Sequence, residues 1–226
     1  MRIDGFIFDL DGTLIDSVDI WAECDRIFLE RYGREYTPEI SEKLKKTTLS
    51  MSAAVLKKEY DLSPSEEEIS AEITDIVRDR YAHGIGLTDG AEEVLRQLHD
   101  AKVPVSIATA NSRELTLSVL KANNILRYID HVVTTDDTCS TKYDPKIFRR
   151  CSELMGTASE NTAVVEDSPH SALTAMEDGF YTIGTDSLHY GDFEKMPDCS
   201  DVQVRHLGEL SEMMTVKNGY ATIGDA

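Results

Sequence analysis

The sequence predicts an α/β protein whose parallel β-sheet core is interrupted by one all-helical insertion. From about residue 91 onward, short apolar runs alternate with amphipathic helical segments, which is typical of parallel strands joined by crossover helices. Residues 16–84 carry only helical periodicity. The apolar run at 6–8 has the character of the later strands, so we expect the helical segment to interrupt the core after its first strand.

The strands of the core are predicted from short apolar runs that are bounded by turn residues. The first strand is the apolar run at 6–8, with Ile3 just before it. The later strands are expected at 103–109, 132–134, 162–166, 180–183 and 202–204. The helices between them are expected at 91–101, 111–122, 145–156, 168–179 and 210–214. Asn111 and Ser168 supply the cap signals of the second and fourth helix. The sequence at 217–226 carries no pattern from which we predict a helix or a strand.

Four helices are expected within the insertion. Ser17 is the candidate N-cap of the first, Pro38 opens the second, and the third begins near Ser50. The sequence at 63–66 predicts a capping box with proline at the first position of the fourth helix. The aromatic side chains expected in the core of the insertion are Trp21, Tyr32 and Tyr60.

A glycine-rich stretch follows the insertion, with glycines at 84, 86 and 90. This composition predicts a linker or hinge. We therefore expect two domains, a core formed by residues 1–15 and 86–226 and a helical domain formed by residues 16–85. A chain of 226 residues with 41% hydrophobic residues is long enough for such a core with a smaller insert.

Charge and composition exclude several classes of partner. The net charge of −19 and the absence of a basic patch argue against binding to nucleic acid or to anionic membranes. No apolar stretch approaches the ~18 residues of a membrane span, and the N-terminus lacks the apolar region of a signal peptide. The four cysteines show no metal-site or disulfide spacing, which is typical of a cytoplasmic protein.

Two aspartates, Asp9 and Asp11, end the first strand. Because buried strands do not tolerate unpaired carboxylates, we expect both just beyond the strand, at the edge of a parallel sheet where ligands bind. Two neighbouring carboxylates repel each other, and a divalent cation such as Mg²⁺ is the simplest way to keep both ionised. Gly12 permits a steep turn, and the alternative interpretation is an aspartate-rich turn without a ligand.

Polar residues also follow three later strands. Thr109 and Asn111 lie at a helix start that either binds an anion or is only capped. Lys142 precedes another helix, where it is either solvated or directed at a phosphate. Glu166 and Asp167 follow a buried strand directly, and since helix capping does not require both acids, they indicate a metal site.

Together these residues resemble a known family. The sequence Asp-Leu-Asp-Gly-Thr at 9–13, followed by Thr109, Lys142 and the pair Glu166-Asp167, resembles the four ordered motifs of the haloacid dehalogenase-like hydrolase superfamily. The helical insertion after the first motif resembles the C1-type cap of its phosphoglycolate phosphatase and β-phosphoglucomutase branch. The resemblance implies a Rossmann-like parallel core with an inserted cap that closes over the substrate.

The resemblance also implies roles for these residues. Asp9 would be the nucleophile that forms an aspartyl-phosphate, and Asp11 the general acid and base. The carboxylates of Asp9 and Asp167 and the backbone carbonyl of Asp11 would hold Mg²⁺, with Glu166 in the outer shell. The residues that would bind the phosphoryl group are Thr109, Ala110, Asn111 and Lys142.

The chain departs from the family pattern at several turns. Thr141 and Tyr143 flank Lys142 where the family usually has glycine and proline, and Ser171 stands where glycine is usual. Asp89 stands where a proline usually precedes Gly90. These changes affect loop geometry rather than the charged groups. His170, close to the last motif, is expected to face solvent.

The function implied is a Mg²⁺-dependent phosphatase that acts on a small phosphorylated metabolite. One alternative is a sugar phosphomutase of the β-phosphoglucomutase kind, and another is a non-catalytic phosphate-binding module on the same fold. A dehalogenase is favoured still less by the resemblance, because those members lack the second aspartate, which a halide leaving group does not need, and Asp11 is present here. The candidate specificity residues, chosen by position only, are Lys43, Lys45, Lys46, Thr47, Thr48 and Ser50.

Overall fold

The computed structural model describes residues 1–17, 19–44, 49–186 and 193–224. The chain divides into two compact units. One is formed by Met1–Val18 and Ile85–Ala226, and the other by Asp19–Gly84. We refer to them as the core unit and the helical unit.

The core unit is built on a six-stranded sheet with the order β4-β3-β2-β5-β6-β7, in which every neighbouring pair is parallel. This arrangement confirms the predicted α/β fold class. Strand β2 (Gly5–Phe8) lies at the centre, and all four of its residues are buried. The other strands are β3 (Val105–Thr109), β4 (His131–Thr134), β5 (Thr162–Glu166), β6 (Tyr181–Thr185) and β7 (Val202–Val204).

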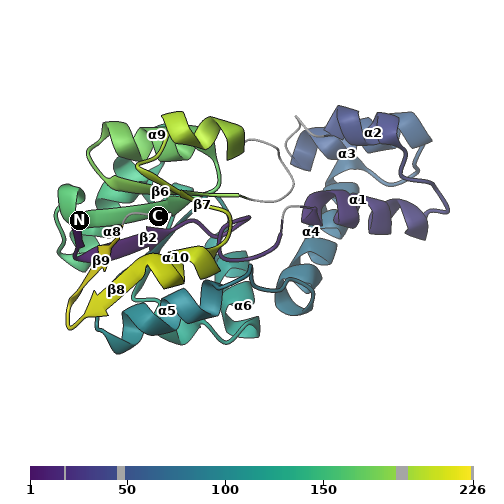
Figure 1. Ribbon diagram of the computed structural model, residues 1–226. Coiled ribbons are helices and arrows are strands. Elements are labelled where there is room, and N and C mark those ends of the chain that lie inside the picture. The colour runs from purple at the N-terminus through teal and green to yellow at the C-terminus, as the bar shows by residue number, and fades with distance from the viewer. Residues whose placement is uncertain (18, 45–48, 187–192, 225–226) are drawn as a thin grey trace. The chain divides into compact units, whose positions relative to one another are not determined.

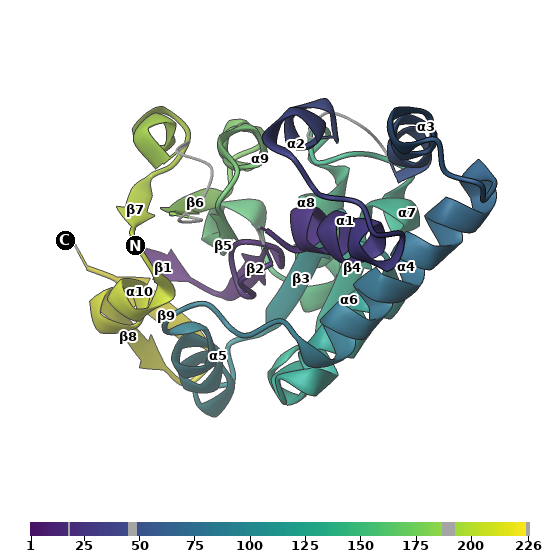
Figure 2. The same cartoon turned by 90° about the vertical axis from the view of Figure 1, so that its right-hand side faces the viewer.

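Helices cover both faces of this sheet, with α5 and α6 on one face and α8 and α9 on the other (Figures 1 and 2). The helices of the core unit are α5 (Ala91–Asp100), α6 (Arg113–Ala122), α7 (Thr135–Thr138), α8 (Lys146–Met155), α9 (Pro169–Glu177) and α10 (Leu207–Met213). Short 3₁₀ turns occupy Leu126–Tyr128, Ser159–Asn161 and Phe193–Asp198. Ile7 and Val164 from the strands pack in one buried cluster with Phe148 and Phe180, whose rings meet edge to face. This apolar layer supports the strand ends that carry the acids.

A second, antiparallel sheet joins the two ends of the chain. It has the order β1-β9-β8 and consists of β1 (Arg2–Ile3), β8 (Met214–Lys217) and β9 (Tyr220–Ile223). The tail at 217–226, for which no element is predicted, thus contributes the end of β8 and all of β9. The pair Asn218-Gly219, a strong hairpin signal, connects β8 to β9, with Gly219 at a φ of 86°. Ile3, expected beside the first strand, belongs to this sheet instead.

The helical unit has four helices and no strand over the described residues 19–44 and 49–84. They are α1 (Ile20–Arg31), α2 (Pro38–Leu44), α3 (Leu49–Tyr60) and α4 (Glu66–His83). Ser65 caps α4 in a capping box with Glu68, so the cap lies two residues beyond the predicted Ser63 and Pro64 precedes it. Trp21, expected in the core of this unit, is 46% exposed because the inner side of α1 is formed by its neighbours Ile20, Cys24 and Phe28.

Over the described residues, the helices are too short or too polar to span a lipid bilayer. Of the specificity candidates chosen by position, Lys45, Lys46, Thr47 and Thr48 lie outside the described residues, as does the side chain of Ser50. Lys43 pairs with Glu59 at 2.7 Å.

Candidate active site

The first acidic residue is positioned by an extension of the central strand. The N–H of Asp9 donates to the carbonyl of Val165 at 2.9 Å, so pairing with β5 continues one residue beyond β2. The chain then turns sharply, with Gly12 at a φ of 84°, a value that favours glycine. The N–H of Leu14 donates back to the carbonyl of Leu10 at 3.0 Å, which closes the turn. The carboxylate of Asp9 is thereby fixed at the carboxyl edge of the sheet.

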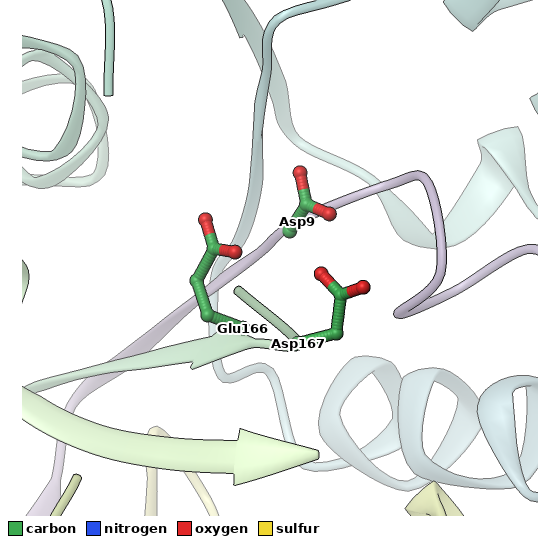
Figure 3. A group of neighbouring side chains, drawn as sticks. All are labelled: Asp9, Glu166 and Asp167. Carbon is green, nitrogen blue, oxygen red and sulfur yellow. The ribbon is translucent and has the colours of Figure 1, made fainter. Parts of the chain in front are cut away.

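Three carboxylates meet at this edge. Asp9, Glu166 and Asp167 each offer an oxygen, and these oxygens all lie within 4.8 Å of one another. Figure 3 shows the three side chains converging from the ends of β2 and β5. Because these strands are adjacent and parallel, residues 157 positions apart in the chain can share one ligand. The structure thus brings together Asp9 and Asp167, the two carboxylates expected to hold a metal, and adds Glu166 to them.

Lys142 lies against two of these acids. Its Nζ donates to Oε1 of Glu166 at 2.6 Å and also to Oδ1 of Asp9. The side chain is buried, and it comes from the loop that precedes α8. The interpretation of this lysine as a solvated residue is therefore wrong. Its ammonium group compensates part of the negative charge of the cluster.

The cluster remains short of positive charge. Burial raises the pKa of Asp9 although Lys142 opposes the change, and burial with the charges of Asp9 and Asp167 raises the pKa of Glu166 well above its usual value. Burial and the charge of Asp9 raise the pKa of Asp167 to about 7. Burial alone would lower the pKa of Lys142, but Asp9 and Glu166 outweigh it, so the pKa of this lysine is raised. The three carboxylates therefore lie in a buried site with one ammonium group beside them, and burial is the largest cause of their raised pKa values.

The donor set fits a hard divalent cation. All three side chains offer carboxylate oxygens, the ligands that Mg²⁺ and Ca²⁺ prefer. Glu166 is only 1% exposed, and its Oε2 is buried without a hydrogen-bond partner among the described residues. A buried carboxylate oxygen without a partner is costly, and a cation close to it would remove that cost.

The end of β3 supplies polar groups next to Asp11. Thr109 is fully buried, and its Oγ1 accepts the N–H of Asn111 at 3.0 Å. Nδ2 of Asn111 donates to Oδ2 of Asp11 at 3.2 Å. Helix α6 begins at Arg113 with Ser112 as its N-cap, two residues later than predicted. Residues 109–111 therefore precede the helix, and Asn111 contacts Asp11.

Ser17 is a site residue that sequence reasoning missed. It was expected to cap the first helix of the insertion, but α1 begins only at Ile20, after Asp19. Instead Oγ of Ser17 donates to Oδ1 of Asp11 at 2.8 Å. Both carboxylate oxygens of Asp11 therefore accept hydrogen bonds, one from Ser17 and one from Asn111. No spacing rule predicts this contact, because it depends on how the turn at 12–15 doubles back.

Most of the site residues line a cavity of about 390 Å³ in the core unit, whereas Ser17 and Asn111 are not among its lining residues. Its volume lies in the range of small-molecule sites. The cavity is lined by Asp9, Asp11, Thr109, Ala110, Thr135, Thr141, Lys142, Tyr143, Glu166, Asp167, Ser168, His170 and Ser171. His170 is exposed, as expected, and it also lines this cavity. Ser168 makes no side-chain cap bond to α9, but its Oγ lies 2.7 Å from Nδ1 of His170.

Comparisons with known proteins agree with this architecture. The family model for haloacid dehalogenase-like hydrolases matches residues 6–185. A validoxylamine A 7'-phosphate phosphatase from Streptomyces hygroscopicus subsp. limoneus is 27% identical over 204 residues, which cover 90% of this chain and 94% of the relative. Hexitol phosphatase A from Escherichia coli K12 is 28% identical over 195 residues, which cover 83% of this chain and 85% of the relative.

Among solved structures, a candidate β-phosphoglucomutase from Thermotoga maritima superposes with a TM-score of 0.83 at 22% identity. The match covers 92% of this chain and 96% of that chain, so the two proteins share their fold. The resemblance stated from the four motifs is confirmed by the family match, which spans all of them. The chain belongs to the haloacid dehalogenase-like hydrolase family.

Proposed function

We propose that this protein is a Mg²⁺-dependent phosphatase that hydrolyses a small phosphorylated metabolite through an aspartyl-phosphate intermediate. One observation carries the proposal. Asp9, the first acid after the central strand, lies in a single cavity with Lys142, Asp167 and Thr109. A nucleophilic carboxylate, a cation that offsets phosphate charge, a metal ligand and a hydroxyl donor are thereby available to one phosphoryl group.

In the first half-reaction, a carboxylate oxygen of Asp9 attacks phosphorus and forms a bond to it. The bond between phosphorus and the leaving-group oxygen breaks, and Asp11 delivers a proton to that oxygen, so that an alcohol departs. The hydrogen bonds from Ser17 and Asn111 hold the carboxyl group of Asp11 in a fixed orientation for this transfer. The product on the protein is an acyl phosphate at Asp9.

In the second half-reaction, Asp11 removes a proton from a water molecule as its oxygen attacks phosphorus. The bond between phosphorus and Asp9 breaks, inorganic phosphate is released, and the carboxylate of Asp9 is restored. Throughout, the hydroxyl of Thr109 and the backbone amides of Ala110 and Asn111 donate to the phosphoryl oxygens, and the Asn111 amide exchanges its bond to the Thr109 hydroxyl for one to phosphate. Lys142, already in contact with Asp9, reduces the repulsion between that carboxylate and the phosphate dianion.

Mg²⁺ would be held by the carboxylates of Asp9 and Asp167 and by the backbone carbonyl of Asp11, with Glu166 in the outer shell. When bound, the ion supplies charge compensation between the attacking carboxylate and the phosphate. The close approach of the carboxylate oxygens of Asp9, Glu166 and Asp167 supports this assignment. Residues 19–84 act in this proposal as the cap that excludes bulk water during catalysis.

A small substrate fits the charge of the protein. A net charge of −19 disfavours binding to polymeric phosphates such as nucleic acids and to anionic membranes. Relatives whose names state a phosphorylated small molecule as substrate support the same class. All four cysteines are free, which is consistent with a cytoplasmic protein.

The test is phosphate release from a panel of phosphomonoesters with and without Mg²⁺. We expect metal-dependent release by the wild-type protein and loss of release by Asp9→Asn, with Asp100→Asn on the surface of α5 as the matched control. Undiminished release by Asp9→Asn would refute the mechanism. Isomerisation of a sugar phosphate without net release would favour the phosphomutase alternative. Calorimetric binding of Mg²⁺ and a phosphate mimic without any turnover would favour the non-catalytic module.

A further inference from the structure

Two aromatic rings stack at the cavity. The ring of Tyr143 lies over the imidazole of His170 with centroids 4.3 Å apart and an angle of 19° between the planes. Both residues line the cavity that contains Asp9 and Lys142. One face of the tyrosine ring is therefore covered by the imidazole, whereas the side chain as a whole is 72% exposed. A large aromatic side chain that is held on one face and open on the other is suited to receive a further ring.

The imidazole that supports Tyr143 is itself fixed. Oγ of Ser168 lies 2.7 Å from Nδ1 of His170, and Oγ of Ser171 lies 3.2 Å from Nε2. Each ring nitrogen thus has a hydroxyl partner, which sets the orientation of the ring plane. Ser171, which provides one of these two hydroxyl groups, is buried in the first turn of α9.

The stacked pair joins two of the positions at which the chain departs from its family pattern. Tyr143 stands where proline is usual, and Ser171, which contacts the supporting imidazole, stands where glycine is usual. Neither side chain is needed by the two half-reactions described above. Together they build a stacking surface that proline and glycine would not provide.

The position of Tyr143 relates this surface to the reacting phosphate. Lys142 is 8% exposed and contacts Asp9 on the floor of the cavity, whereas the next residue, Tyr143, is largely exposed. Both residues line the cavity, so a buried cation and an exposed aromatic ring are offered to the same bound molecule. Stacking on this ring requires that the leaving group of a phosphoryl group bound at Asp9 and Lys142 extend toward Tyr143.

We propose that Tyr143 is a specificity-determining residue that stacks on a planar ring in the leaving group, with His170 as the residue that positions it. This inference rests on the proposed phosphatase function and names its substrate class as phosphomonoesters with an aromatic or heteroaromatic ring close to the phosphate. Aromatic stacking contributes about 0.5–1.5 kcal/mol beyond the burial of area, which corresponds to about 2- to 12-fold in kcat/KM.

The test compares three substrates with the same CH₂–O–phosphate linkage: benzyl phosphate, cyclohexylmethyl phosphate and ethyl phosphate. We expect wild-type kcat/KM to be highest for benzyl phosphate. Tyr143→Leu is expected to lower the ratio of benzyl to ethyl phosphate by about 5- to 10-fold, and Tyr143→Phe to preserve it. His170→Ala is expected to lower the ratio by a smaller factor, while Tyr220→Leu in β9 serves as the control outside the cavity.

The outcomes separate the inference from the function on which it rests. If Tyr143→Leu leaves the ratio unchanged while ethyl phosphate is still hydrolysed, the stacking proposal is wrong and the phosphatase assignment stands. An equal loss for benzyl and cyclohexylmethyl phosphate would also overturn it, since it would indicate non-specific apolar contact. If no substrate is turned over, calorimetric binding of benzylphosphonate and ethylphosphonate to the same variants decides the question by the same ratio.

Discussion

The ammonium nitrogen of Lys142 lies 2.6 Å from Oε1 of Glu166 and also contacts Asp9, so one buried cation joins the ends of two strands. The loop before α8 is thereby tied to both β2 and β5. Removal of this cation would leave two buried carboxylates without the only ion-pair partner that they have among the described residues. The first prediction tests this relationship.

Lys142→Met is expected to lower kcat by about 100- to 1,000-fold, because a preorganised positive charge next to the phosphoryl site is lost. Without Mg²⁺ the variant is also expected to be less stable by about 3–5 kcal/mol, since it breaks a buried ion pair. The loss of stability should be larger at pH 8 than at pH 5. At pH 5 the carboxyl groups of Asp9 and Glu166 are more readily protonated in the folded variant, so fewer buried charges remain without a partner. Urea unfolding at both pH values measures this difference.

The matched control for that experiment is Lys146→Met, since Lys146 is exposed and forms its ion pair with Asp144 on the surface. It is expected to change stability by less than about 1 kcal/mol at either pH. Equal destabilisation of the Lys142 variant at pH 5 and pH 8 would contradict the electrostatic account.

The second prediction concerns pH and Mg²⁺. The pKa of Asp167 is raised from its ordinary value to about 7, so the folded protein without metal binds more protons than the unfolded chain between about pH 4 and pH 7. Stability conferred by the protonated carboxyl group is present below pH 4 and is lost as the pH rises to 7. Thermal unfolding in a chelator should therefore show a melting temperature that falls across this window.

Added Mg²⁺ should reverse this loss, since an ion that binds only the folded state at 100 times its Kd stabilises by about 2.7 kcal/mol. The effect is expected to disappear in Asp167→Asn. Burial also raises the pKa of Asp25 in α1 to about 7, so Asp25→Asn is the control that changes the pH profile but keeps the response to Mg²⁺. A Mg²⁺ response that survives Asp167→Asn would argue against a metal site at this residue.

The third prediction tests the residue that sequence reasoning missed. Ser17→Ala removes the hydrogen bond to Oδ1 of Asp11 and is expected to lower kcat by about 10-fold, through a misoriented proton donor and acceptor. KM should change little, because Ser17 does not line the cavity. Ser17→Thr retains the hydroxyl and should recover most of the activity. A Ser17→Ala enzyme with wild-type kcat would show that this contact has no role in catalysis.

The fourth prediction concerns Gly90, which the sequence analysis assigned to a linker. Its φ is 80°, and a Cβ at this position would overlap the backbone of Gly208 at the start of α10. Gly90→Ala is therefore expected to destabilise the protein by about 2–5 kcal/mol, from backbone strain and overpacking together. Gly86→Ala is the control, since a Cβ at Gly86 meets no atom within 4 Å. Equal melting temperatures for the two variants would refute this account.

The central strands of the core were predictable because β2, β3 and β5 are buried along their whole length. The bounds predicted for 162–166 and for the half-exposed edge strand 202–204 are confirmed without change, and those of the other strands with small shifts at their ends. The C-terminal hairpin was missed because it is half exposed and carries little apolar pattern. Its turn, Asn218-Gly219, was the available signal.

The charged residues of the site were predictable for a related reason. A buried strand that ends in acids has few explanations, and Asp9, Glu166 and Asp167 do lie together. The neutral partners were less accessible to sequence reasoning. Ser17 reaches Asp11 only through the path of a turn, and the stacking of the exposed His170 on Tyr143 joins the start of α9 to the loop that carries Lys142. Contacts of this kind depend on tertiary geometry, which local patterns do not encode.

The small second sheet has a consequence for how the chain is made. Strand β1 pairs only with β9 among the described strands, and more than 200 residues separate the two. A ribosome therefore exposes β1 long before its partner exists, and this pairing must wait until residues 220–223 have left the exit tunnel. The six-stranded sheet needs no residue beyond Val204, so it can assemble before β8 and β9 have been made.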